Sequence, residues 1–319
     1  YIKINKAFLG AGSALDLAAD ANNFTYTDGE LDITVQAIDD NGDVKTTYST
    51  GLGTVIRTEK DIIKDQGIFD NSINVLYKFN ASINRDYMYK VIIINTILNK
   101  EVSAESKIVG STVVSKPSTG TKFQFWNGTV ASGNSLNKSF SVTTGADIGR
   151  VGMVVKFNYT EFYTNGMDSS DHSVIMPLGD VQTISPIANE SLDWVLQGET
   201  FFENISARVS SPSSISHFSH RRLENISLDF SLAGTELSTY MEVTAPSSSV
   251  NQDKPGYTNV NNGLGIVSSR ETINWFSSID PVTSNQINIQ NSTILKLQSL
   301  GLGFCFGTTG TGFPVVPCQ

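Results

Sequence analysis

Residues 30–49, ELDITVQAIDDNGDVKTTYS, contain the clearest strand pattern in the sequence. Apolar residues occupy every second position from Leu31 to Ala37, which is the period of a strand with one buried face. The dipeptide Asn41-Gly42 favours a tight turn, and a second run rich in Lys, Thr and Tyr follows it. The stretch therefore predicts a β-hairpin near the start of the chain.

Other strand-like runs surround this hairpin and are separated by Asn, Gly and Asp turns. They lie at 1–9, 74–80, 86–97 and 103–114. Residues 14–22 interrupt them and predict a short helix or an ordered loop. Closely spaced short strands with polar turns are typical of an immunoglobulin-like β-sandwich, which we predict for residues 1–114.

A second β-rich domain is predicted over residues 115–319. The stretch VSKPSTGTK at 114–122 is rich in Ser, Thr, Gly and Pro, as expected of a joint between domains. Alternating runs follow at 122–128, 137–145 and 150–166. Two further alternating runs flank LAGTE within residues 222–246 and predict another hairpin.

Two helices are expected in this second domain. Apolar residues recur near helical spacing over 190–208, which predicts a helix that Gly198 weakens or breaks. Residues 292–300 predict a shorter helix that ends at Gly301.

Composition and charge exclude several classes of protein. Charged residues make up 17% of the chain and the net charge is −9, so binding to nucleic acid or to an anionic lipid surface is not expected. The sequence contains no run of about 18 apolar residues that predicts a membrane-spanning helix. Low charge with many Ser, Thr and aromatic residues favours an exported β-rich protein.

The only two cysteines, Cys305 and Cys318, lie close together near the C-terminus, with a Gly- and Pro-rich loop between them. We predict a disulfide between them, which would stabilise the fold by about 3 kcal/mol through loop entropy and which indicates an oxidising compartment such as the periplasm or the cell surface. Two free, buried thiols are the alternative.

Three short stretches bring together residues of the kinds that bind metal ions, although each stretch is also explained by an ordinary loop or turn. They are His217 and His220 in SHFSHRR; Asp168, Asp171 and His172 in NGMDSSDHS; and Asp39, Asn41 and Asp43 in DDNGDV. The first offers half of a zinc site, and the second suits a divalent cation. The third departs from the calcium-loop pattern at Val44, where that pattern needs Gly. We predict no catalytic residue, cofactor or metal.

Longer phrases carry a family resemblance. They are YIKINKAFLGAGSALDLA at 1–18, QGIFDNSINVLYKFNA at 66–81, GETFFENISARV at 198–209, RRLENISLDFSLAGTELSTYMEV at 221–243 and PGYTNVNNGLGIVSSR at 255–270. In this order they resemble a family of Bacteroidota surface lipoproteins with a domain of unknown function. The resemblance implies a lipid anchor upstream of Tyr1, an outer-membrane location and a place beside outer-membrane β-barrel proteins. It implies no catalytic residues.

Three functions are therefore considered. The first is a non-enzymatic, surface-exposed accessory subunit of an outer-membrane β-barrel complex used for transport, export or assembly. Trp126, Tyr257 and Trp275 are candidate contact aromatics, with core packing as the alternative for each. The second function is a glycan- or ligand-binding surface lipoprotein for nutrient uptake. The third is a hydrolase whose acidic residues converge only in space.

Overall fold

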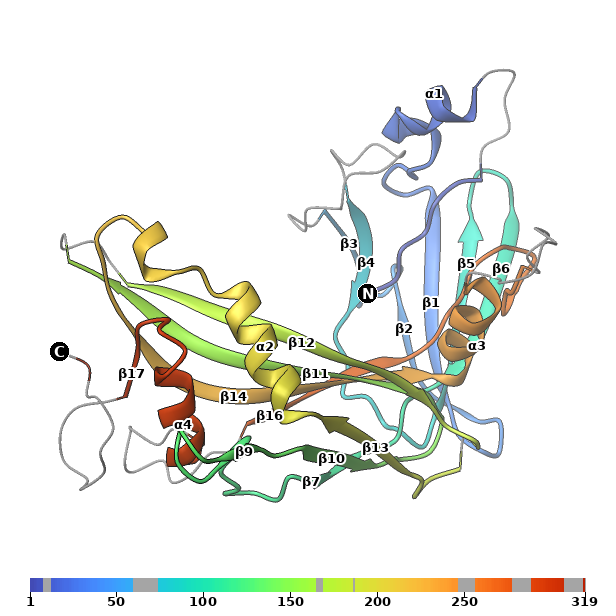
Figure 1. The fold of residues 1–319 in the computed structure, drawn as a ribbon. Coiled ribbons are helices and arrows are strands. Elements are labelled where there is room, and N and C mark those ends of the chain that lie inside the picture. The colour runs from blue at the N-terminus through green and yellow to red at the C-terminus, as the bar shows by residue number, and fades with distance from the viewer. Residues whose placement is uncertain are drawn as a thin grey trace, which may run out of the picture. The chain divides into compact units, whose positions relative to one another are not determined.

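The computed structural model in Figure 1 divides the chain into two compact units, and each unit is built from two separate segments of sequence. Unit 1 contains Tyr1–Ile108 and Glu236–Ser269, and unit 2 contains Val109–Thr235 and Arg270–Gln319. The structure describes residues 1–7, 13–59, 74–164, 169–185, 187–245, 256–276, 288–306 and 318. Both units are mainly β, which confirms the predicted fold class.

Unit 1 is organised around a five-stranded antiparallel sheet in the order β15-β6-β5-β1-β2. Its strands are β1 (Leu31–Ile38), β2 (Val44–Ser49), β5 (Met88–Asn95), β6 (Lys100–Lys107) and β15 (Val260–Asn261). A second, two-stranded sheet pairs β3 (Val55–Glu59) with β4 (Val75–Phe79). The predicted hairpin is confirmed as β1 and β2, joined by the turn at residues 39–43.

The core of unit 1 lies between these two sheets. Ile33 and Val35 come from the inward face of β1, and Val55 and Tyr77 come from the two-stranded sheet. The helical pieces of unit 1 are α1 (Ala14–Ala18), the 3-10 turn η1 (Ala21–Asn23) and α3 (Thr235–Thr244), which begins one residue before the segment assigned to unit 1. The two sheets and the core between them form a sandwich-like arrangement, as the alternating pattern in the sequence predicts.

Unit 2 contains two main sheets, one of them with very long strands. The larger has the order β12-β11-β14-β16, and the short strand β17 pairs in parallel with β14. These strands are β11 (Ile148–Tyr163), β12 (Ser170–Gln182), β14 (Phe218–Gly234), β16 (Arg270–Phe276) and β17 (Phe304–Cys305). The smaller sheet has the order β13-β10-β7, with β7 (Val113–Lys116), β10 (Lys138–Thr143) and β13 (Ser191–Leu196). A further short pair joins β8 (Trp126–Asn127) to β9 (Asn134–Ser135).

Helix α2 (Gly198–Arg208) contributes aromatic side chains to the core of unit 2. The rings of Phe201 and Phe125 stack with centroids 4.0 Å apart, and Phe157 of β11 meets Phe201 edge-on. Gly198 begins the helix where a Cβ would lie 2.6 Å from the Leu136 oxygen, so only glycine fits there. The other helical pieces are η2 (Pro212–Ser214) and α4 (Asn291–Gln298), which confirms the helix predicted near 292–300.

The predicted division into residues 1–114 and 115–319 is wrong in two respects. The chain passes into unit 2 at Val109, because β7 pairs with β10 rather than continuing β6. Residues 236–269 return to unit 1, because β15 adds to the edge of β6 and the Glu236 carboxylate accepts hydrogen bonds from Ser106 and Ser268.

Two predicted elements are also corrected. The first half of the helix predicted near 190–208 is the strand β13, in which Leu192, Trp194 and Leu196 are buried and the residues between them are exposed. The hairpin predicted at 222–246 is one long strand, β14, followed directly by α3. In the described part of the chain, no helix combines the length and the apolar character needed to cross a membrane.

Candidate functional site

One end of the unit 1 sheet carries four aliphatic side chains that project into solvent. Leu52 follows β2, Ile97 and Leu98 form the turn between β5 and β6, and Leu264 lies in the loop after β15. Their exposed fractions are 66%, 70%, 62% and 89%, respectively. We call these four residues the apolar loop end. Large aliphatic side chains this exposed make little contribution to the core of unit 1.

The antiparallel register brings these loops to the same end of the sheet, where the strands meet their turns. Leu31 at the start of β1 pairs with Asn95 at the end of β5, and Thr34 pairs with Ser49 at the end of β2. Strand β15 runs antiparallel to β6, so the loop that follows Asn261 extends toward the same end. Because neighbouring strands lie about 4.8 Å apart, the apolar loop end spans roughly 20 Å.

Side-chain hydrogen bonds hold the backbone of each of these loops. Ser49 Oγ accepts from the Leu52 amide at 3.1 Å, and Asn95 Oδ1 accepts from the amides of Ile97 and Leu98 at 3.0 and 2.9 Å. Thr258 Oγ1 donates to the Gly265 carbonyl at 2.9 Å, beside Leu264. Gly265 has a φ of +135°, which favours glycine. The four side chains are therefore presented on fixed turns.

The three aromatic residues singled out in the sequence do not form one cluster. Trp126 and Trp275 both pack against the core of unit 2, whereas Tyr257 belongs to unit 1. Trp126 Nε1 donates to the Thr129 carbonyl at 3.0 Å, and Trp275 meets Phe123 edge-on with centroids 6.0 Å apart. Both tryptophans thus take the core-packing role that the sequence left as the alternative.

The two cysteines are joined by a disulfide, with their Cα atoms 5.0 Å apart. Cys305 is buried in β17, which lies beside β14 in parallel register, with Cys305 opposite Arg222. The predicted pairing is therefore present. Cys318 is fixed to the unit 2 sheet through this bond.

A buried ion pair supports the same part of unit 2. Arg221 of β14 is completely buried, and its Nε and Nη2 atoms each lie 2.9 Å from Glu161 Oε2 on β11. The guanidinium also donates to the carbonyls of Ser210 and Leu302, and it lies 4.8 Å from the centre of the Phe218 ring. A buried charge with this many partners is stabilised rather than left unpaired.

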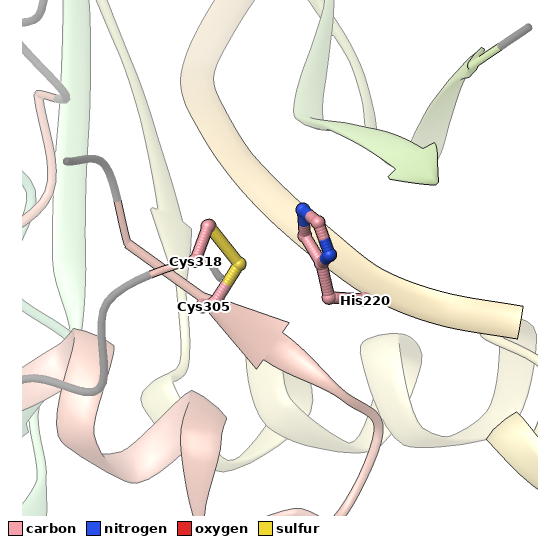
Figure 2. Close-up of side chains that lie close together, drawn as sticks. All are labelled: His220, Cys305 and Cys318. Atoms are coloured by element: carbon pink, nitrogen blue, oxygen red, sulfur yellow. A yellow bond between two sulfur atoms is a disulfide. The ribbon is translucent and has the colours of Figure 1, made fainter. Parts of the chain in front are cut away.

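His220 lies beside the disulfide, as Figure 2 shows. One ring nitrogen of His220 and the Sγ atoms of Cys305 and Cys318 all lie within 4.8 Å of one another. The imidazole stacks on Phe162 with centroids 4.7 Å apart. Burial, with a smaller effect from Arg222, lowers the pKa of His220 below its ordinary value. His217 is not part of this group, so the pair His217 and His220 does not form half of a site.

A shallow polar groove of about 380 Å³ lies on β11, β12 and β14. Thr160 Oγ1 lies 2.8 Å from Asp171 Oδ1 and 2.9 Å from Glu224 Oε1, and Arg222 Nε donates to Glu224 at 2.7 Å. Asn158 links to Asn225 at 2.8 Å on the same face. The groove offers hydrogen-bond donors and acceptors side by side.

The divalent-cation site considered for residues 165–173 is not assembled from its described members. Asp171 accepts from Thr160, whereas His172 stacks on Tyr159, because successive strand residues face opposite sides of a sheet. Asp168 lies outside the described residues.

The DDNGDV stretch forms the hairpin turn that the sequence already offered as the alternative to calcium. Asp39 Oδ1 accepts from the amides of Asn41 and Asp43, and Asp39 Oδ2 lies 2.8 Å from Lys45 Nζ. These interactions lower the pKa of Asp39 to about 2, with Lys45 as the largest cause.

The comparisons with known proteins identify no family for the chain. No protein-family model matches the chain, and no curated protein was found to be similar to it.

Sequence reasoning missed both the apolar loop end and the proximity of His220 to the disulfide. Four aliphatic residues spread over three turns give no local pattern, and only the register of the sheet brings them together. His220 and the cysteines are more than eighty positions apart and meet through the β14–β17 pairing. The signal available was weaker: Leu52, Ile97, Leu98 and Leu264 each stand next to turn residues.

Proposed function

We propose that this protein is a non-enzymatic, surface-exposed accessory subunit that docks through its apolar loop end onto an outer-membrane β-barrel complex. The observation that carries the proposal is the gathering of Leu52, Ile97, Leu98 and Leu264 at one end of a sheet. The resemblance to Bacteroidota lipoproteins supports the outer-membrane location and a lipid anchor at the cell surface. The disulfide supports an oxidising compartment.

A protein partner is favoured by the form of this surface. Full burial of an exposed Leu or Ile contributes about 1.5–3 kcal/mol, so four of them supply a substantial share of a stable contact. Their turns are already held by hydrogen bonds from Ser49, Asn95 and Thr258. Little conformational entropy is then lost on docking, which improves affinity.

The test is a mild-detergent pull-down of the full-length protein from its native outer membrane, with mass spectrometry of the proteins recovered. We expect a β-barrel protein at near one-to-one stoichiometry with the wild-type chain. The combined variant Leu52→Ser, Ile97→Ser, Leu98→Ser and Leu264→Ser should recover at least about 10-fold less of it, as expected when a hydrophobic interface centre is lost.

A matched control uses exposed aliphatic residues of unit 2. Ile184 and Ile187 are 95% and 74% exposed, and the double change to Ser should leave partner recovery unchanged. The proposal is wrong if the wild-type protein comes out alone or if the fourfold variant keeps its partner. It is also wrong if the chain by itself floats with phosphatidylcholine vesicles and the fourfold variant does not, because the surface then contacts lipid.

A second candidate function rests on the polar groove. Asn158, Asn225, Asp171, Glu224 and Arg222 place amide, carboxylate and guanidinium groups together, and the hydroxyls of a glycan both donate and accept hydrogen bonds. This favours a glycan-binding role in nutrient uptake. A glycan array with the wild-type chain and an Asn225→Ala variant tests it. Binding that is unaffected by Asn225→Ala places any glycan elsewhere.

A further inference from the structure

We propose that His220, Cys305 and Cys318 form a zinc-binding site when the disulfide between the two cysteines is reduced. The three candidate ligand atoms already lie within 4.8 Å of one another in the oxidised protein (Figure 2). Among the His, Cys, Asp and Glu residues that the structure describes, this is the group of three close enough to share one metal ion.

The main chain fixes two of the three ligands in place. His220 belongs to β14 and Cys305 to β17, and these strands pair in parallel, with Arg221 opposite Phe304 and Arg222 opposite Cys305. The Arg221 amide also donates to the Gly303 carbonyl at 2.8 Å, at the start of β17. The distance between His220 and Cys305 is therefore set by the sheet and not by the disulfide.

Two neighbouring side chains hold the imidazole of His220 in place. The Ser219 hydroxyl lies 3.0 Å from its Nδ1 atom, and the ring stacks on Phe162. When Nδ1 donates its proton to this hydroxyl, the lone pair of the ring lies on Nε2. A hydrogen bond from the second ring nitrogen is the common way in which proteins fix the tautomer of a ligating histidine.

Two thiolates and one imidazole match the preferences of zinc. Zinc binds Cys sulfur at about 2.3 Å and His nitrogen at about 2.0–2.1 Å in tetrahedral geometry. Ligand atoms in such a site lie roughly 3.5–4 Å apart, a spacing that follows from those bond lengths. The His220 nitrogen lies within 4.8 Å of both sulfur atoms, and the two sulfur atoms, which are bonded to each other in the oxidised protein, move apart once the disulfide is reduced. A water molecule takes the fourth position, as in zinc sites with three protein ligands.

The neighbouring charges permit a cation here. Arg221 is paired with Glu161, and Arg222 is paired with Glu224, so each guanidinium next to His220 already has its own carboxylate. The two thiolates then balance the double positive charge of the zinc ion. Disulfide sulfur atoms carry no such charge, so the oxidised protein holds no zinc at this site.

The site forms when the disulfide is reduced and zinc then binds. A dithiol reductant exchanges with the disulfide and supplies two electrons and two protons. The Cys305–Cys318 bond breaks, both cysteines become thiols, and the reductant leaves as its own disulfide. A zinc ion then displaces the two thiol protons as it binds. Exchange with the disulfide form of the same reductant reverses the step: the two thiolates form the Cys305–Cys318 bond again, the reductant's disulfide takes up the two electrons and two protons from water to become a dithiol, and the zinc ion is released.

The consequence is that the link from Cys318 to the unit 2 sheet is kept in both redox states. It is covalent under oxidising conditions and metal-bridged under reducing conditions. This inference is independent of the proposed docking function, because it uses residues of unit 2 alone.

The test uses the full chain, reduced with a water-soluble phosphine, which takes up oxygen from water and leaves no competing thiol. Cobalt(II) replaces zinc as the probe under anaerobic conditions. We expect the reduced chain to bind one cobalt ion with a sulfur-to-cobalt charge-transfer band, and zinc should displace it. The oxidised chain should show no such band.

Three variants make the result specific. His220→Ala should weaken cobalt binding at least about 10-fold. His217→Ala, three residues away, should leave it unchanged. His220→Cys supplies another ligand and should restore binding with a stronger charge-transfer band, provided that circular dichroism shows the same fold for all three. The proposal fails if the reduced wild-type chain gives no band or if His220→Ala binds cobalt as tightly as the wild type.

Discussion

Unit 1 leaves four aliphatic side chains in water at the apolar loop end, whereas unit 2 buries the guanidinium of Arg221 completely. Both features reverse the usual distribution of apolar and charged groups, but only one is explained by folding. Arg221 has Glu161 and two backbone carbonyls as partners. Leu52, Ile97, Leu98 and Leu264 contribute little to the core of unit 1. The buried charge therefore serves the fold, whereas the exposed aliphatic residues are the better candidates for contact with a partner.

The largest effect is expected from loss of the buried ion pair of unit 2. Arg221→Met leaves the Glu161 carboxylate buried without its cationic partner and should lower the free energy of unfolding by about 3–5 kcal/mol. All three tryptophans, Trp126, Trp194 and Trp275, belong to unit 2, so urea unfolding followed by tryptophan fluorescence reports on this unit.

Arg222→Met is the matched control for this change. The side chain of Arg222 is 46% exposed and pairs with Glu224, so its loss should change the free energy of unfolding by less than about 1 kcal/mol. Equal effects of the two substitutions would contradict the structural role given to the buried pair.

Loss of the disulfide should have the next largest effect. The bond closes a loop between positions 13 apart, and its removal by Cys305→Ser with Cys318→Ser should cost about 3 kcal/mol in the free energy of unfolding of unit 2. The same fluorescence measurement checks it, made without added metal. Amide exchange in β1 should not change, since unit 1 does not contain the bond.

A pH titration tests an ion pair in unit 1, between Asp39 and Lys45 of the β1–β2 hairpin. Asp39 should titrate at a pKa of about 2, below its ordinary value of 3.8, chiefly because Lys45 hydrogen-bonds the carboxylate. The folded form thus binds its proton less readily than the unfolded form. The stability that Asp39 contributes is present above pH 3.8 and is lost as the pH falls through about 2. Carboxylate NMR should show this pKa, and Lys45→Met should raise it.

The smallest effect on stability is expected at the apolar loop end. Leu264→Ser should change the protection of the amides of β1 and β5 against hydrogen exchange by less than about 0.5 kcal/mol. Ile33→Ala in the core of the same unit should lower it by about 2–5 kcal/mol. A large loss for Leu264→Ser would show that this residue serves the fold and would remove it from the docking surface.

The sequence predicted elements well where a single period was clear. Alternation from Leu31 to Ala37 gave the β1–β2 hairpin, and Ile294 and Leu297 gave α4. Prediction failed where two patterns overlapped. In β13, Leu192, Trp194 and Leu196 alternate as a strand, but Leu192, Val195 and Leu196 also fit a helix.

The domain boundary and the candidate sites depend on contacts between distant segments. Nothing local to residues 236–269 shows that they belong with unit 1, because their strand partner is β6. The cysteine pairing was predictable from spacing alone. The position of His220 beside it was not, because it follows from the pairing of β14 with β17.

The insertion of Glu236–Ser269 has a consequence for how the chain is made and cut. Because the chain is synthesised from its N-terminus, the outer edge of β6 stays unpaired until β15 is made, after most of unit 2. Strands β14 and β16, which are neighbours in one sheet, likewise can pair only after residues 236–269 have been synthesised. A fragment ending at Ile108 would keep an unpaired edge of the kind that promotes aggregation. Residues 109–319 contain all of unit 2 together with the inserted segment, whereas no piece shorter than residues 1–269 contains all of unit 1. A cut between residues 114 and 115 would therefore divide both units.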